Sequence, residues 1–83
     1  MRQNGYRDVQ NAFRSWNFTM YHGQASGLVG ARGRYLISVD MRDGIYVVRL
    51  VRDRQPLHDA TGHDPVELVA ELVAWCYREG DLW

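Results

Sequence analysis

The chain of 83 residues has no lysine, one cysteine, two prolines and no long apolar run. The single cysteine, Cys76, cannot form an internal disulfide, so a domain of this size depends on its hydrophobic core. Nowhere do about 18 apolar residues follow one another, as a membrane-spanning helix requires, and the first 20 residues do not have the pattern of a signal peptide. We therefore predict one soluble domain, residues 1–83, in the cytoplasm, where a free thiol stays reduced.

The chain also lacks an excess of charge of either sign. Ten basic residues balance ten acidic ones, so there is no overall field to attract nucleic acid, and any charged site must be local. All ten basic residues are arginine. Two explanations remain open, a GC-rich genome or a requirement for the bidentate contacts that arginine makes with carboxylates and phosphates.

Residues 64–80 carry the signals of one helix. Asp64 is suited to the N-cap, Pro65 to the first helical position, and Gly80 to a left-handed stop. The apolar residues of this helix form two stripes: Val66, Val69, Val73 and Cys76, and beside them Leu68, Leu72 and Trp75. Two surfaces of the helix therefore need cover.

Residues 35–52 predict a β-hairpin, with Asp43 and Gly44 supplying the left-handed positions of a two-residue turn. The register that places Arg42 opposite Ile45 gives one almost entirely apolar face: Tyr35, Ile37, Val39, Met41, Tyr46, Val48 and Leu50. The opposite face is half apolar and includes Arg49, which can pair with Ser38 or Asp40.

The remaining segments give weaker patterns. The helical spacing of apolar residues predicts a short helix over roughly 5–15, capped by Asn4, and the alternation over 16–21 fits a strand or an extended helix. The four glycines between 23 and 33 predict a mobile loop, or a loop around a very short strand at Leu28 and Val29. Residues 53–63 predict a polar link, in which residues 56–58 could add an edge strand.

These elements predict an α+β fold. A small antiparallel sheet, centred on the hairpin 35–52, packs against the C-terminal helix 64–80, and a short N-terminal helix covers a second surface.

The potential metal ligands and nucleophile do not form a recognisable site. His58, His63 and Cys76 match no zinc-finger spacing, and nothing in the sequence places the thiol beside a base and an orienting carboxylate. We therefore predict no metal, no cofactor and no catalytic residue. The glycines of G-L-V-G-A-R-G, with Arg32 and Arg34 beside them, could approach a phosphate, although nucleotide-binding loops are followed by a helix and here a strand is expected.

Arginines and tyrosines concentrate in the middle of the chain, where we predict a partner-binding surface composed of Arg32, Arg34, Tyr35, Arg49, Arg52 and Arg54. Arginine, tyrosine and tryptophan are enriched in protein interfaces. The hypothesis is a non-enzymatic module that occupies a partner protein, such as an anti-CRISPR-like inhibitor from a phage or mobile element, or an adaptor. The alternative is a small nucleic-acid-binding regulator that uses the arginine- and tyrosine-rich sheet and the glycine-rich loop.

The second apolar stripe of the C-terminal helix suggests self-association. If the sheet covers only one stripe, a two-fold axis could bury the other, and the predicted dimer interface is Leu68, Leu72, Trp75, Leu82 and Trp83. The other possibility is that the N-terminal helix covers this stripe by itself.

The hairpin containing D-G-I-Y-V-V, the turn and the capped helix are loosely similar to the HicB-type antitoxin fold over roughly residues 35–78. The resemblance implies an antitoxin-like regulator. No further motif of that family is present, and we do not assign the chain to it.

Overall fold

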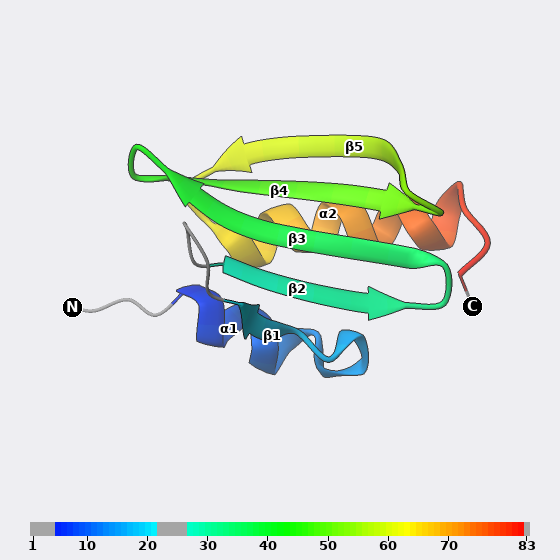
Figure 1. Ribbon diagram of the computed structural model, residues 1–83, viewed down its shortest axis with the longest axis horizontal. Coiled ribbons are helices and arrows are strands. Elements are labelled where there is room, and N and C mark those ends of the chain that lie inside the picture. The colour runs from blue at the N-terminus through cyan, green and yellow to red at the C-terminus, as the bar shows by residue number, and fades with distance from the viewer. Residues whose placement is uncertain (1–4, 22–26, 83) are drawn as a thin grey trace.

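A computed structural model describes residues 5–21 and 27–82, and confirms the predicted α+β class. A five-stranded antiparallel sheet has its strands in chain order, and both helices lie behind it (Figure 1). The strands are β1 (Thr19–Tyr21), β2 (Gly27–Arg32), β3 (Tyr35–Arg42), β4 (Ile45–Arg52) and β5 (Gln55–Gly62). The helices are α1 (Gly5–Ala12), the 3-10 turn η1 (Arg14–Trp16) and α2 (Pro65–Arg78).

Two-residue turns connect β2 to β3, β3 to β4 and β4 to β5. The predicted turn at Asp43 and Gly44 is confirmed, with φ of 52° and 78°, and Arg42 lies opposite Ile45 as expected. The predicted polar link, by contrast, is mostly strand β5. Its composition is polar because β5 is an edge strand with much of its surface in water, and its turn, Asp53 and Arg54, contains no glycine to mark it.

The glycine-rich segment is not a loop from Gly27 onward, because residues 27–32 form β2. Its glycines serve close packing: a Cβ at Gly30 would lie 2.7 Å from the ring of Phe18. Gly23 lies outside the described residues. The strand interpretation of residues 16–21 is confirmed for Thr19–Tyr21, while α1 ends at Ala12, earlier than predicted, and η1 follows it.

Helix α2 begins as predicted, since the Asp64 carboxylate accepts hydrogen bonds from the backbone N–H groups of Val66 (3.1 Å) and Glu67 (3.3 Å). Its end differs from the prediction. Gly80 does not take a positive φ, and the C-cap Glu79 has a φ of −110°. Gly80 is required for space, because a Cβ there would collide with the hydroxyl group of Tyr35.

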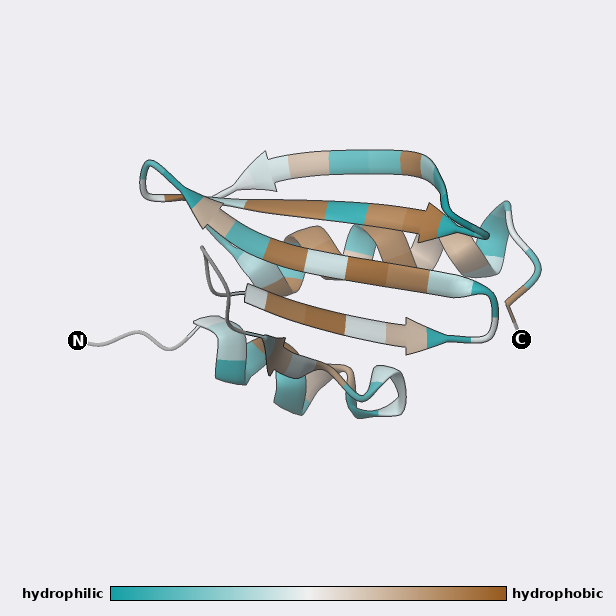
Figure 2. Ribbon diagram, in the orientation of Figure 1, coloured by the Kyte–Doolittle hydropathy of each residue, from teal (hydrophilic) through white to brown (hydrophobic). Residues whose placement is uncertain are grey.

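The core lies between the sheet and the two helices. Figure 2 shows its hydrophobic residues concentrated in β2, β3 and β4, whereas β5 is mainly hydrophilic. The side chains of Ile37, Val39, Val48 and Leu50 on the sheet and Val69 on α2 are fully buried. No helix among the described residues has the length and apolar character needed to cross a membrane.

The turn at Gly44 provides a test of the hairpin. Replacing Gly44 by valine should lower the free energy of unfolding by about 2 kcal/mol, because a β-branched residue is forced to positive φ while its side chain meets no other atom within 4 Å. Thermal unfolding should show a midpoint on the order of 10 °C lower. Gly44→Asn is the control, and its free energy of unfolding should fall much less, since asparagine tolerates positive φ. Equal losses of stability in the two variants would contradict the explanation.

Candidate binding surface

The sheet has one covered face and one open face. Side chains alternate along each strand, so the neighbours of the buried core residues point to the side opposite α1 and α2, where no described element lies (Figure 1). On β2, β3 and β4 the open face contains Val29, Ala31, Leu36, Ser38, Asp40, Arg42, Ile45, Val47, Arg49 and Val51. About half of these side chains are apolar, as the hairpin register predicts.

Three of the apolar side chains, Ala31, Leu36 and Val51, lie together at one end of the open face. Leu36 lies between Ala31 and Val51 in the strand register and is 39% exposed. These residues and the adjacent turns form a hollow of about 450 Å³, whose rim includes Arg34 and Arg54. An exposed apolar patch with a charged rim is typical of a protein interface.

Arg54 occupies a strained position on this rim. The two-residue turn between β4 and β5 requires positive φ at both central residues, and Asp53 and Arg54 have φ of 52° and 71°. Aspartate tolerates this region, whereas arginine has no local hydrogen bond to offset a cost of roughly 1–2 kcal/mol. Arg54 forms no hydrogen bond or ion pair with any described residue. Because strained residues concentrate at functional sites, Arg54 is the strongest single candidate for a partner contact.

The strain at Arg54 gives a direct prediction. Arg54→Gly should raise the free energy of unfolding by roughly 0.5–1 kcal/mol, because glycine adopts positive φ without cost but loses more entropy on folding. Arg54→Ala removes the same side chain without relieving the backbone, so it should leave the unfolding midpoint unchanged. Urea unfolding of both variants measures the difference, and equal midpoints would show that the backbone of Arg54 is not strained.

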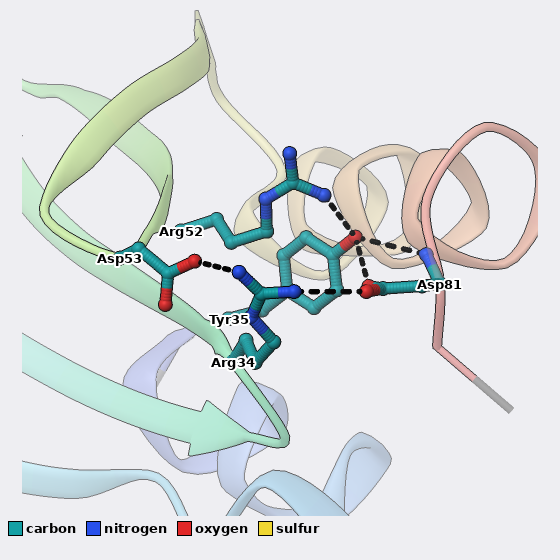
Figure 3. Close-up of polar contacts among 5 residues, drawn as sticks. All are labelled: Arg34, Tyr35, Arg52, Asp53 and Asp81. Atoms are coloured by element: carbon teal, nitrogen blue, oxygen red, sulfur yellow. Dashed lines mark hydrogen bonds and ion pairs between the residues drawn. The ribbon is translucent and has the colours of Figure 1, made fainter.

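Tyr35 is a structural anchor (Figure 3). Its hydroxyl group donates a hydrogen bond to the Asp81 carboxylate (2.8 Å) and accepts one from the Asp81 backbone N–H (3.0 Å) and one from Arg52 (3.5 Å). Arg34 adds ion pairs to Asp53 and, at 3.5 Å, to Asp81. Tyr35 is only 1% exposed, so its prediction as a partner contact is wrong. Its side chain is used to hold the segment after α2 against the start of β3.

The same network keeps Asp81 ionised. The hydrogen bond from Tyr35 is the largest of the effects that lower the pKa of Asp81, and the nearby guanidinium groups of Arg34 and Arg52 act in the same direction. A carboxylate with a lowered pKa remains charged in mild acid. The attachment of the C-terminal segment should therefore persist down to that lowered pKa and weaken as the pH falls through it.

The structure divides the six predicted contact residues into groups. Arg34 and Arg54 lie in neighbouring turns at the rim of the open face. Arg32 and Arg52 are in register with Tyr35 and point to the helix side, where Arg32 contacts the ring of Tyr77 and Arg52 lies over that of Tyr35. Arg49 stands apart, in the middle of the open face. The predicted hairpin register already placed Tyr35 and Arg49 on opposite faces, whereas the position of Arg54 depends on the turn after Arg52, which was not predicted.

The aromatic side chains of the central strands do not lie on the open face, where nucleic-acid bases would have to stack. Tyr35 and Tyr46 both face the helices, and Tyr46 packs edge-on against Tyr6 with ring centroids 6.0 Å apart. On β1, Tyr21 points to the open side, where its hydroxyl donates to the Asp40 carboxylate; this hydrogen bond is the main reason that the pKa of Tyr21 rises to about 12. The described part of the open face therefore lacks a group of aromatic rings on which bases could stack.

The predicted dimer interface is largely buried within one chain. Leu68, Leu72 and Leu82 are 7%, 5% and 6% exposed, and the ring of Trp75 packs against His58 of β5 at 4.8 Å. The premise of an uncovered stripe was wrong, because α2 lies against β4 and β5 on one side and against α1 on another. Trp83 lies outside the described residues. The structure gives no support to a dimer formed through this stripe.

The described residues contain no group of three or more histidine, cysteine or acidic side chains able to hold a metal ion. His58 packs on Trp75, and Cys76 is fully buried. Burial raises the pKa of the Cys76 thiol to about 11, so the thiol stays protonated at neutral pH and is a poor nucleophile.

Comparison with known proteins gives no relative: no protein-family model, no curated protein and no solved structure matches the chain. The binding surface must therefore be judged on its own chemistry.

Proposed function

We propose that the protein is a non-enzymatic binding module that occupies a partner protein through the open face of its sheet. An inhibitor or adaptor, such as an anti-CRISPR-like protein of a phage or mobile element, would work in this way. The observation that carries the proposal is Arg54, an arginine with no partner among the described residues, held at positive φ beside the exposed Leu36.

The chemistry of this surface defines the partner. An apolar side chain of the partner would fill the hollow over Leu36 and Val51, and a carboxylate would bind Arg54 at its edge. Arginine beside a desolvated apolar centre is a common arrangement in interface hot spots. Arg34 is already paired with Asp53 and Asp81, so its guanidinium is less available than that of Arg54.

The alternative function is a nucleic-acid-binding regulator or an antitoxin-like protein. Arg42 and Arg49 on the open face favour it, since both could reach phosphates. Two observations favour a protein partner instead: Asp40 and Asp59 lie among these arginines, and Tyr35 and Tyr46 face the helices. A surface that binds single strands usually combines net positive charge with stacked aromatic rings.

Affinity capture from the native host with matched variants tests the proposal. Wild type should retain a specific protein, and Arg54→Ala and Leu36→Asp should each weaken binding of that purified protein at least about tenfold, as for a hot-spot residue. Arg7→Ala is the control, because Arg7 is an exposed arginine of α1 that pairs with no residue in the described ranges 5–21 and 27–82. All four chains should give the same circular dichroism spectrum.

The alternative requires a separate measurement. Binding to random single- and double-stranded DNA is followed as a function of salt for the same four chains. If Arg54→Ala lowers DNA affinity and the slope of its salt dependence, and no protein is captured, the proposal is wrong and the regulator is favoured.

A further inference from the structure

A second surface lies along the outer edge of β5. This strand ends the sheet order and, among the described residues, pairs only with β4. It has eight residues, whereas β1 at the other edge has three. A long free edge presents unpaired backbone donors and acceptors to which another strand can add.

The pairing pattern indicates which backbone groups are free. The pair that flanks the Asp43–Gly44 turn is hydrogen-bonded, and such pairs alternate with non-bonded ones along an antiparallel ladder. Along β4 this alternation directs the backbone groups of Val48 toward β5, where Ala60 is its partner. Asp59 and Thr61, on either side of Ala60, therefore turn their N–H and C=O groups outward.

Only the second half of β5 is suited to accept a strand. Pro56 has no N–H group, and the register shifts at Leu57, between the partners of Leu50 and Val51. Proline and a bulge are common devices that prevent indiscriminate pairing at a sheet edge. The regular segment, residues 58–62, is the part left available.

A hollow of about 350 Å³ lies between this segment and α2. Its apolar lining includes Ala60, Leu72 and Trp75, and Ala74 borders it from the exposed side of α2. Trp75 is held in place by its contact with His58. A hollow beside a free strand edge is the arrangement in which an added strand obtains affinity from its backbone and specificity from alternate side chains.

The charged side chains around the hollow that form no ion pair with a described residue are acidic. Glu71 on α2 lines the hollow and forms no ion pair with any described residue, and Asp59, in register with Arg49 at the border with the open face, also lines it. Arg78 also lines it but is paired with the neighbouring Glu79 at 3.7 Å. An occupant with a basic residue next to its apolar side chain would complement this charge.

We propose that β5 and α2 form a peptide-binding groove: an extended segment of another protein, with an apolar residue flanked by lysine or arginine, adds to β5 as a sixth strand. Its apolar side chain enters the hollow beside Trp75. This site is distinct from the open face of the proposed function, because it uses the sheet edge and the outer side of α2.

The probe is a library of random decapeptides displayed on phage and selected on the complete chain. Enriched peptides should share an apolar residue with a neighbouring basic one. The best peptide, made synthetically, should bind with an affinity that falls at least tenfold in Ala74→Trp, which fills the hollow. Ala70→Trp, an exposed alanine one turn away that does not line the hollow, is the matched control and should bind normally.

Backbone pairing between β5 and the peptide is tested by changing each of them in turn. Thr61→Pro removes one outward N–H group and should weaken binding, and amide exchange at Asp59 and Thr61 should slow when the peptide is added. Should Thr61→Pro fail to fold, N-methylation of the peptide at alternate residues provides the same test: one set of positions should abolish binding and the other should not.

Several results would overturn the proposal. They are a library that yields no binding peptide, a peptide that is insensitive to Ala74→Trp and to N-methylation, and a chain whose β5 pairs with a second copy so that no peptide competes. Leu36→Asp should not affect peptide binding, so failure of this site and failure of the open-face site can be told apart.

Discussion

Replacing Leu72 by glutamate should unfold the domain. Leu72 is 5% exposed between α2 and β5, so the variant loses the burial of a leucine, roughly 2–5 kcal/mol for truncation alone, and also places a carboxylate among apolar side chains. A domain of this size is stabilised by only a few kcal/mol. Circular dichroism and amide proton dispersion should show loss of the folded state at 25 °C.

Ala70→Glu is the control for this prediction, because Ala70 is exposed on the same helix and should tolerate a charge within about 0.5 kcal/mol. Sedimentation equilibrium gives the decisive contrast. A wild type that dimerises, together with a Leu72→Glu variant that is a folded monomer, would show that Leu72 is an interface residue and that its burial within one chain is incorrect.

Gly30→Ala should destabilise the protein by about 1–3 kcal/mol, the usual cost of overpacking. The added Cβ would lie 2.7–2.9 Å from three ring atoms of Phe18. Phe18 cannot easily move away, because it is 5% exposed and its ring stacks on Trp16 with centroids 6.4 Å apart. Chemical denaturation at equilibrium measures the loss.

Gly62→Ala is the matched control. Its Cβ would lie 3.4–3.7 Å from the side chain of Leu68, an ordinary contact, and its φ is not positive. This variant should therefore be neutral, or more stable by up to about 1 kcal/mol because the unfolded chain loses freedom. A double variant, Gly30→Ala with Phe18→Leu, should recover part of the lost stability. If the two changes in the free energy of unfolding were fully additive, the two residues would not interact.

The glycine pattern illustrates how a local signal can be misread. The spacing of Gly27 and Gly30 is the same whether the segment binds phosphate, forms a loop or lets a strand pack closely. The close approach of Phe18 decides between these possibilities, and Phe18 is 12 residues away in the chain. Glycine within a strand is a known sign of such contacts, but the sequence does not indicate which residue approaches.

The binding surface was partly predictable. Arg34 and Arg54 were among the predicted contacts and do meet at one rim, while Tyr35 is buried and Arg32 points to the helix side. The groove beside β5 was not predicted, because the turn at Asp53 and Arg54 has no glycine. The one available signal was the repeated spacing: two-residue turns recur at 33–34, 43–44 and 53–54, and each is followed by a strand of eight residues.

Elements that depend on local interactions were predictable from the sequence. The Asp64 cap, the left-handed turn at Gly44 and the alternation that sets the hairpin register each depend on neighbouring residues and on the preferences of single side chains. Which surfaces are covered depends instead on how the elements pack together. The burial of Leu72, the anchoring of Tyr35 by Asp81 and the exposure of Leu36 depend on where α1 and α2 dock on the sheet. That placement follows from contacts between residues far apart in the chain, which hydrophobic periodicity does not specify.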